Sequence, residues 1–258
     1  MKRINTMLML TLIAVASYAQ EYKYTPKGDV SNITVLIENL FADVVIEGVN
    51  SNEITITTSD YEGIPEKAQG LKPLSATGPE NTGIGLSVIQ EGNTIKISGA
   101  SRKANGDYYI KLPKNIKLKA DMNHWQAGDF VATGLTNDVE VKSQNSDLVL
   151  KNITGPLVAY SLSADIEVVF TSLSQTTPTS ISTTSGDLDI TIPATTKGNF
   201  KLGTVSGEIY TDIDFKFNNS DEMKRLGGGM KADASLNGGG VDIALKSVSG
   251  DVFIRKAK

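Results

Sequence analysis

Short runs in which apolar and polar residues alternate make up most of the chain after residue 32. In the run NITVLIEN, Ile33, Val35 and Ile37 fall on one face, and polar residues fall largely on the other. An alternation with a period of two is typical of a half-buried β-strand. Further runs of this kind are DVVIEG, EITITT, NTIKIS, YYIKLP and IKLKA. The pattern predicts an all-β protein.

Helical spacing is scarce by comparison. The segment DEMKRL (221–226) predicts one helical turn at most. Residues 59–83 are rich in glycine and proline, which break both helices and strands. We therefore expect a long loop there.

A repeat becomes visible from about residue 127. It is marked by acidic residues that follow a small or amide residue: Asp129, Asp138, Asp147, Asp165, Asp187, Glu208, Asp242 and Asp251. From Asp129 through Asp147, Asp165 and Asp187 to Glu208 the intervals are 18, 18, 22 and 21 residues, and Asp251 follows 43 residues later. Two short strands in roughly twenty residues fit one coil of a β-solenoid. A meander of hairpins shares this spacing but favours two-residue Asn-Gly or Asp-Gly turns.

The coils of such a solenoid must stack, because one coil alone buries too few apolar side chains to offset the entropy of ordering it. Stacking supplies hydrogen bonds between coils and closes an apolar column. We expect that column to contain Leu148, Leu150, Ile166, Val168, Leu188, Ile190, Ile192, Ile209, Val252 and Ile254. The predicted fold is a parallel β-helix-like solenoid with an N-terminal β-strand cap.

The acidic residue of each coil has a structural and a chemical interpretation. In SGDLDITI the period of two turns Leu188 and Ile190 inward and Asp187 and Asp189 outward. We expect the preceding glycine to take a positive φ at a sharp corner, and the aspartate to accept a hydrogen bond from a nearby backbone N–H. In this interpretation the acidic residues fix turns.

Stacking would place successive acidic residues about 5 Å apart. Like charges at that distance repel by roughly 1 kcal/mol even in water. Backbone donors, a bound Ca²⁺ or nearby lysines could offset the repulsion, the lysines being Lys142, Lys151, Lys201 and Lys246. The chain contains GD but not the GGxGxD of calcium-binding repeats. A calcium-stabilised repeat protein is therefore an alternative, and no metal ligand is assigned.

A carbohydrate-active enzyme is the other alternative. Asp187 and Asp189 would have Cβ atoms roughly 7 Å apart, within the range of a carboxylate pair in an inverting glycosidase. Any alternating acidic strand produces this spacing, so we expect no catalytic residue. The single histidine, His124, stands beside the single tryptophan, Trp125. We expect His124 to pack or to lie at the surface, while an exposed Trp125 could stack on a sugar ring.

The composition excludes several classes of function. The 25 Lys and Arg residues and 29 Asp and Glu residues give a net charge of −4, which offers no basic field for nucleic acid. Cysteine is absent, which excludes disulfides, thiolate nucleophiles and thiolate metal sites. No cofactor is expected.

The first residues have the pattern of a secretory signal peptide. MKR is followed by the apolar run MLMLTLIAVA and by SYA, which predicts cleavage after Ala19 or Gln20. No later segment is apolar enough to span a membrane. We expect an exported protein in the periplasm, on the outer cell surface or outside the cell.

Three stretches in this order resemble a bacterial putative-adhesin β-strand-repeat family: VSNITVLIENLFADVVIEGVNSNEITIT, then YYIKLPKNIKLKA, then serial SGD-type coils closed by NGGGVDIALKSVSGDVFIRK. The resemblance implies a β-helix-like fold in exported, adhesin-like proteins, and it carries over no catalytic residue. Segments 171–180 and 216–240 depart from the pattern.

The resulting organisation has three parts: a signal peptide (1–20), an N-terminal β-strand cap (21–125) and a β-solenoid (126–258), the last two in one continuous domain. RKAK at the C-terminus would place charges beside the edge opposite the cap. The expected function is non-catalytic binding or structural support at the cell envelope, with a cell-surface glycan or an envelope protein as partner. Nothing in the sequence indicates the oligomeric state.

Overall fold

The computed structural model of the chain describes residues 20–58, 61, 63, 65–71, 74–75, 77–100, 106–217 and 229–258. The predicted signal peptide lies outside these residues except for Gln20, and DEMKRL lies outside them too. Within the described part, the helical segments are two 3-10 turns, η1 (Val30–Asn32) and η2 (Glu66–Ala68). No helix in this part is long and apolar enough to cross a membrane.

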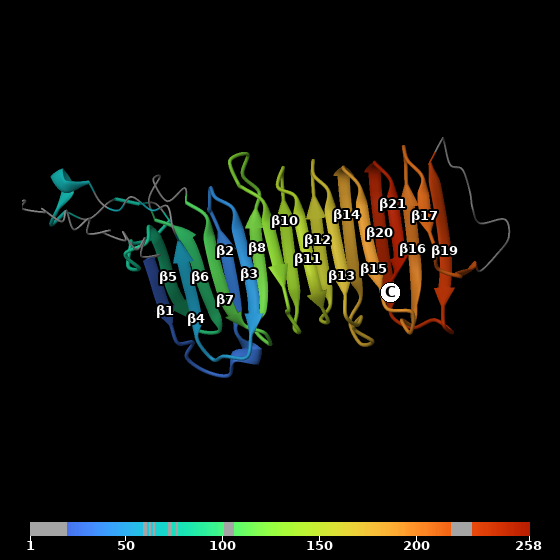
Figure 1. The fold of residues 1–258 in the computed structure, drawn as a ribbon, viewed down its shortest axis with the longest axis horizontal. Coiled ribbons are helices and arrows are strands. Elements are labelled where there is room, and N and C mark those ends of the chain that lie inside the picture. Colours follow the sequence, from blue (N-terminus) through green and yellow to red (C-terminus); the bar gives the residue numbers. More distant parts are fainter. Residues whose placement is uncertain are drawn as a thin grey trace, which may run out of the picture.

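Two long sheets face one another across a shared core, with their strands side by side along the molecule (Figure 1). Sheet A contains, in spatial order, β1 (Gln20–Tyr24), β4 (Ile54–Thr58), β7 (Tyr108–Pro113), β3 (Val44–Val49), β9 (Phe130–Thr133), β11 (Leu148–Ile153), β13 (Ile166–Phe170), β15 (Leu188–Ile192), β21 (Val252–Lys256) and β17 (Ile209–Thr211). Sheet B contains β18 (Lys216–Phe217), β19 (Met230–Leu236), β16 (Gly198–Thr204), β20 (Asp242–Ser249), β14 (Thr179–Ser185), β12 (Leu157–Ser161), β10 (Val139–Ser143), β8 (Lys117–Met122), β2 (Thr34–Glu38), β6 (Thr94–Gly99) and β5 (Leu86–Glu91).

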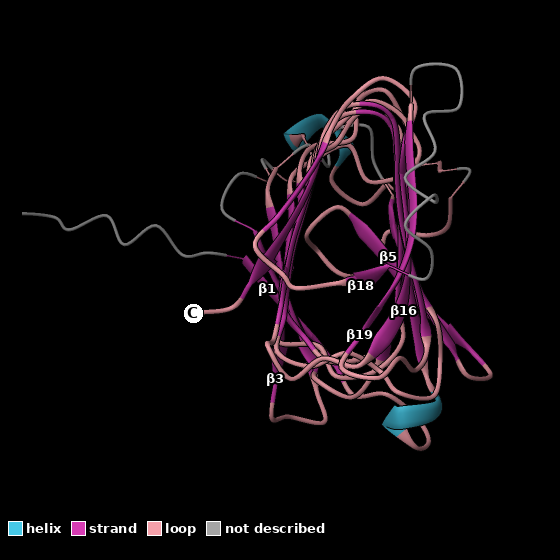
Figure 2. Ribbon diagram, turned by 90° about the vertical axis from the view of Figure 1, so that its right-hand side faces the viewer, coloured by secondary structure: helices cyan, strands magenta, loops and turns pink. Residues whose placement is uncertain are grey.

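Each coil consists of one strand of sheet B followed by one strand of sheet A. The coils β8–β9, β10–β11, β12–β13 and β14–β15 follow one another in chain order and pair in parallel in both sheets. Viewed along the long axis of the molecule, the two sheets face each other and loops form the corners (Figure 2). The predictions of an all-β protein and of a β-solenoid are confirmed.

The chain order and the spatial order differ at both ends of the stack. The last coil, β20–β21, lies between β14–β15 and β16–β17, and the coil β2–β3 lies between β6–β7 and β8–β9. The interval of 43 residues between Glu208 and Asp251 therefore does not measure two successive coils. The prediction that RKAK lies beside an open edge is also wrong, because β21 pairs with β15 on one side and β17 on the other.

Antiparallel strands close the stack at each end. At one end β1 pairs antiparallel with β4, β4 with β7, and β5 with β6, which confirms the predicted N-terminal cap. The segment 21–125 also contributes parallel strands, β2, β3, β6, β7 and β8, to the stack itself. At the other end β19 and β18 add antiparallel strands to sheet B. Reversed strands interrupt the parallel repeat, so a further coil does not simply continue it.

The apolar column forms as predicted. Leu188 pairs with Ile166 and Val252, and Ile190 pairs with Val168 and Ile254, all with side chains buried. Ile209 is only partly buried because β17 is the last described strand of sheet A. Successive inward residues thus occupy equivalent positions in successive coils, and their burial supplies the main stabilising term.

Candidate functional site

All the predicted acids except Asp138 and Asp242, which pair with Lys117 and Lys201, join Asp43 in one continuous ladder along a corner of the stack. In spatial order its members are Asp43, Asp129, Asp147, Asp165, Asp187, Asp251 and Glu208. The backbone N–H of each member after Asp43 donates to the Oδ1 of the member before it, over distances from 2.7 to 3.3 Å. Each carboxylate before Glu208 therefore binds the next coil and not its own turn. We call this set the acidic ladder.

The glycines before these acids have a different role from the one predicted. A Cβ on Gly186 would overlap the carbonyl oxygen of Ala164, one on Gly250 that of Gly186, and one on Gly207 that of Gly250. Gly250 and Gly207 have no positive φ. Gly186, for which the sequence predicted a positive φ, has a φ of 157°, so the prediction is confirmed there and does not extend to Gly250 and Gly207. Glycine is required because successive corners approach too closely for a side chain.

A second row of hydroxyls, which the alternating pattern does not predict, lines the inside of the same corner. The hydroxyls of Thr183, Ser247 and Thr204 donate to the carbonyl oxygens of Ala164, Gly186 and Gly250, respectively, over 2.9–3.1 Å. Thr183, Ser247 and Thr204 are buried. The signal available in the sequence was a hydroxyl residue at an inward position where the pattern calls for an apolar one.

Backbone donors thus offset part of the repulsion within the acidic ladder, whereas three of the four nearby lysines pair with other carboxylates. Lys142 binds Glu140, Lys151 binds Glu167, and Lys201 binds Asp242. The hydrogen bond from Lys201, at 2.7 Å, lowers the pKa of the Asp242 carboxyl. In the described ranges no group of three or more potential ligands is placed to hold a metal ion. Calcium stabilisation stays an untested alternative.

The residues with the most distinctive exposed chemistry lie on the outer face of sheet A near β17. Asp189, Phe253 and Tyr210 are paired across β15, β21 and β17. The Phe253 and Tyr210 rings stack with centroids 5.2 Å apart and planes 11° from parallel. The Arg255 guanidinium lies over the Phe253 ring, 5.4 Å from its centroid. We call Tyr210, Phe253, Arg255 and Asp189 the aromatic platform.

The polar part of the platform is held in place by a two-point ion pair. Arg255 Nε donates to Asp189 Oδ1 at 2.8 Å, and Arg255 Nη2 donates to Asp189 Oδ2 at 2.9 Å. These hydrogen bonds raise the pKa of Arg255. A planar, two-point contact fixes the orientation of the guanidinium better than a single bond would. The platform therefore presents a rigid combination of ring faces, cation and anion.

Two shallow hollows meet at Phe253. One, of about 310 Å³, is lined by Asp147, Asp165, Asp187, Glu167 and Asp189 among others. The other, of about 280 Å³, is lined by Tyr210, Thr211, Asp212, Phe253, Ile254 and Arg255. Together they form a surface that offers hydroxyl groups several carboxylate acceptors beside an exposed aromatic ring.

The two carboxylates that were considered as a catalytic pair line the same hollow but have different hydrogen-bond partners. Asp187 Oδ1 accepts from the Asp251 N–H at 2.7 Å, as part of the acidic ladder. Both oxygens of Asp189 are bound by Arg255. The two residues thus belong to different hydrogen-bonding networks, one holding the corner and one holding the platform.

His124 and Trp125 lie away from this surface, in the loop between β8 and β9. The His124 ring packs 4.3 Å from that of Phe41, and its Nδ1 accepts from the Gln126 N–H. Trp125 is exposed. Stacking of a sugar on Trp125 stays an untested alternative.

Comparison with known proteins gives one family and several distant structural likenesses. The family described as Toastrack DUF4097 matches residues 114–255. A putative cell adhesion protein of Clostridium sporogenes is 11% identical with a TM-score of 0.46, over 93% of this chain and 100% of that one. A putative adhesin of Bacteroides fragilis is 10% identical with a TM-score of 0.43, over 94% and 98%. No curated protein matches. The resemblance inferred from the sequence is confirmed.

Proposed function

The chain belongs to the Toastrack DUF4097 family, and we propose that it is an exported, non-catalytic binding module that holds a cell-surface polysaccharide on the aromatic platform. The pattern of residues 1–20 supports export, since a cationic start, an apolar run and small residues precede the first strand. The site of action would be the cell envelope.

The observation that carries the proposal is the stacked pair of Tyr210 and Phe253. Tyr210 is 51% exposed although its ring is large and partly apolar. An exposed, preordered aromatic ring can cover the apolar C–H face of a pyranose at little entropic cost. The carboxylates on one side of Phe253 and Arg255 on the other can bind the hydroxyl groups at the sugar edge.

The platform supports binding more than cleavage. Glycoside hydrolysis requires one carboxyl group to protonate the leaving oxygen and a second to act as nucleophile or base. Asp189 is committed to Arg255 through both oxygens. Asp187 is committed to the Asp251 N–H through Oδ1. Both groups have structural partners that a catalytic role would disrupt.

The proposal is tested by incubating the purified protein with a panel of envelope and host polysaccharides. Retention on each polymer and release of new chain ends are recorded in the same samples. Retention without new chain ends is the expected result. New chain ends would favour a carbohydrate-active enzyme, and Asp187 and Asp189 would then be the first carboxylates to replace. Absence of retention on every polymer would contradict a glycan partner and favour an envelope protein.

A further inference from the structure

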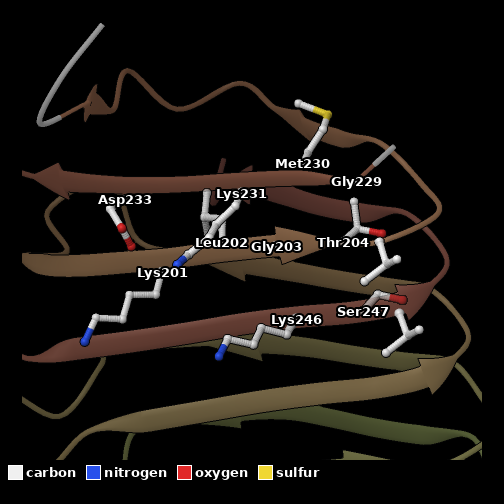
Figure 3. Close-up of a pocket in the computed structure, with 12 residues that line it drawn as sticks. Lys201, Leu202, Gly203, Thr204, Gly229, Met230, Lys231, Asp233, Lys246 and Ser247 are labelled. Atoms are coloured by element: carbon white, nitrogen blue, oxygen red, sulfur yellow. The ribbon is translucent and has the colours of Figure 1, made fainter. Parts of the chain in front are cut away.

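A separate hollow lies on the outer face of the other sheet, among β19, β16 and β20 (Figure 3). Its volume is about 480 Å³, within the range of small-molecule sites. The strand register arranges its lining in three successive rows. The first row contains Asp233 and Lys201, and the second contains Lys231, Gly203 and Lys246. Just beyond the paired residues, Gly229, Val205 and Val248 form the third row.

Gly203 creates the centre of this hollow. The residue has no positive φ, and a Cβ placed on it would meet only the Met230 carbonyl oxygen, at 3.7 Å. That distance is an ordinary van der Waals contact. Neither backbone conformation nor close packing therefore requires glycine here, in contrast to Gly250 at the corner. What the missing side chain provides is open space between two lysines.

The second row is cationic. Gly203 is paired with Lys231 on one side and with Lys246 on the other. In the part of the chain that the structure describes, neither of these lysines is in an ion pair, whereas Lys201 is bound to Asp242. Figure 3 shows both lysines on strands that flank Gly203. Two ammonium groups beside one open space favour an anion.

The third row is aliphatic. Val205 is 54% exposed and Val248 is 44% exposed, and they lie on adjacent chain segments joined by the hydrogen bond from Ser206 N–H to the Val248 carbonyl. Met230 adds a flexible apolar wall. The hollow thus changes from cationic to apolar along the strands, over the roughly 7 Å that separate alternate residues of a strand.

We propose that this hollow binds a fatty carboxylate, with the carboxylate between Lys231 and Lys246 and the acyl chain over Gly203 and the two valines. An acyl chain fits better than a peptide, because β16 pairs with both neighbours through its backbone. The floor of the hollow thus has few backbone groups left to hydrogen-bond with the N–H and C=O groups of a peptide. A peptide whose backbone groups stay unpaired binds less tightly. An acyl chain needs none of these partners and gains from covering aliphatic surface.

The test is calorimetric titration of the purified protein with decanoate, decanol and acetate. Decanol has the chain without the charge, and acetate has the charge without the chain. We expect decanoate to bind at least about tenfold more tightly than decanol or acetate. The preference over decanol is the amount that two exposed charge contacts provide. Equal binding of decanoate and decanol would overturn the proposal. Tighter binding of a short peptide ending in leucine would overturn it too.

Two variants locate the site. Gly203→Val fills the hollow without backbone strain and should abolish decanoate binding, while the double variant Lys231→Met, Lys246→Met should bind decanoate and decanol equally. Lys119→Met, on the same face of sheet B, is the control and should bind as the unaltered protein does. Circular dichroism and thermal melting check that each variant is folded. Unchanged decanoate affinity in Gly203→Val, or in a folded double variant, would contradict the proposal.

Discussion

At the scale of single residues, each aspartate of the acidic ladder accepts a backbone hydrogen bond from the next coil of the stack. The interval of about twenty residues identified every ladder acid except Asp43, but an interval carries no information on which backbone N–H donates to each carboxylate. Asp187 could equally have closed its own turn. The hydrogen bond to Asp251, a residue 64 positions away, depends on the order of coils, which only the folded structure provides.

Asp187→Ala should therefore destabilise the protein more than Asp187→Asn. Alanine leaves the partly buried Asp251 N–H without its acceptor, which costs about 1–2 kcal/mol in free energy of unfolding. Asparagine keeps an oxygen at the same position and also removes one of a row of like charges. Urea denaturation of the two variants measures the difference. Equal destabilisation would mean that the ladder bond contributes nothing.

The two kinds of glycine predict opposite effects of alanine. In Gly250→Ala the new Cβ overlaps the Gly186 carbonyl oxygen, and we expect a loss on the order of 3 kcal/mol in free energy of unfolding. Gly203→Ala, the matched control, makes only an ordinary contact and should gain about 0.5 kcal/mol from the lower entropy of its unfolded chain. Thermal melting compares the two. A tolerated Gly250→Ala would contradict the close approach of the corners.

At the scale of elements, the alternation predicted the strands well because burial on one face of a sheet requires it. The stacking order was less accessible. Two coils with the same inward pattern, such as β16–β17 and β20–β21, could each pack beside β14–β15. The local pattern alone therefore does not predict which of them occupies that position in the stack. The antiparallel β19 next to β16 resolves the choice, because it occupies the sheet B edge of β16 and leaves β20–β21 the position beside β14–β15.

Hydrogen exchange tests this order. If β21 is an interior strand, the amides of Leu188 and Val252, which donate to the carbonyl oxygens of Asp251 and Glu208, should exchange as slowly as those of β13. A C-terminal strand at an open edge would fray and exchange fast. Rapid exchange of Val252 together with slow exchange in β17 would contradict the insertion of the last coil.

At the scale of the whole molecule, the solenoid separates structural from exposed chemistry. The corner and the interior hold the coils together, while the outer faces of the two sheets carry the platform and the hollow of β16. The acidic pattern pointed to the corner, and Asp189 was identified as an outward residue. The platform was not predictable, because Tyr210 and Phe253 are 43 residues apart and meet only through the insertion of β21.

A calcium-stabilised solenoid would differ from this account in its response to chelation. The ladder carboxylates already accept backbone hydrogen bonds, so we expect no calcium site that exists only in the folded chain. An ion that binds folded and unfolded chains equally leaves the melting temperature unchanged, so the melting temperature should be the same in millimolar-range Ca²⁺ and in chelator. Differential scanning calorimetry provides the measurement. A melting temperature that rises with Ca²⁺ and returns with chelator would establish the calcium alternative.

The central claim, that the aromatic platform binds a glycan, is tested most directly by comparing Tyr210→Ala with Tyr109→Ala. Both tyrosines are 51% exposed on strands of sheet A, but only Tyr210 stacks on Phe253. With a polysaccharide that retains the unaltered protein, affinity electrophoresis should show about tenfold weaker retention for Tyr210→Ala, as loss of one stacking ring implies. Tyr109→Ala should be retained fully. Equal retention of both variants would contradict the claim.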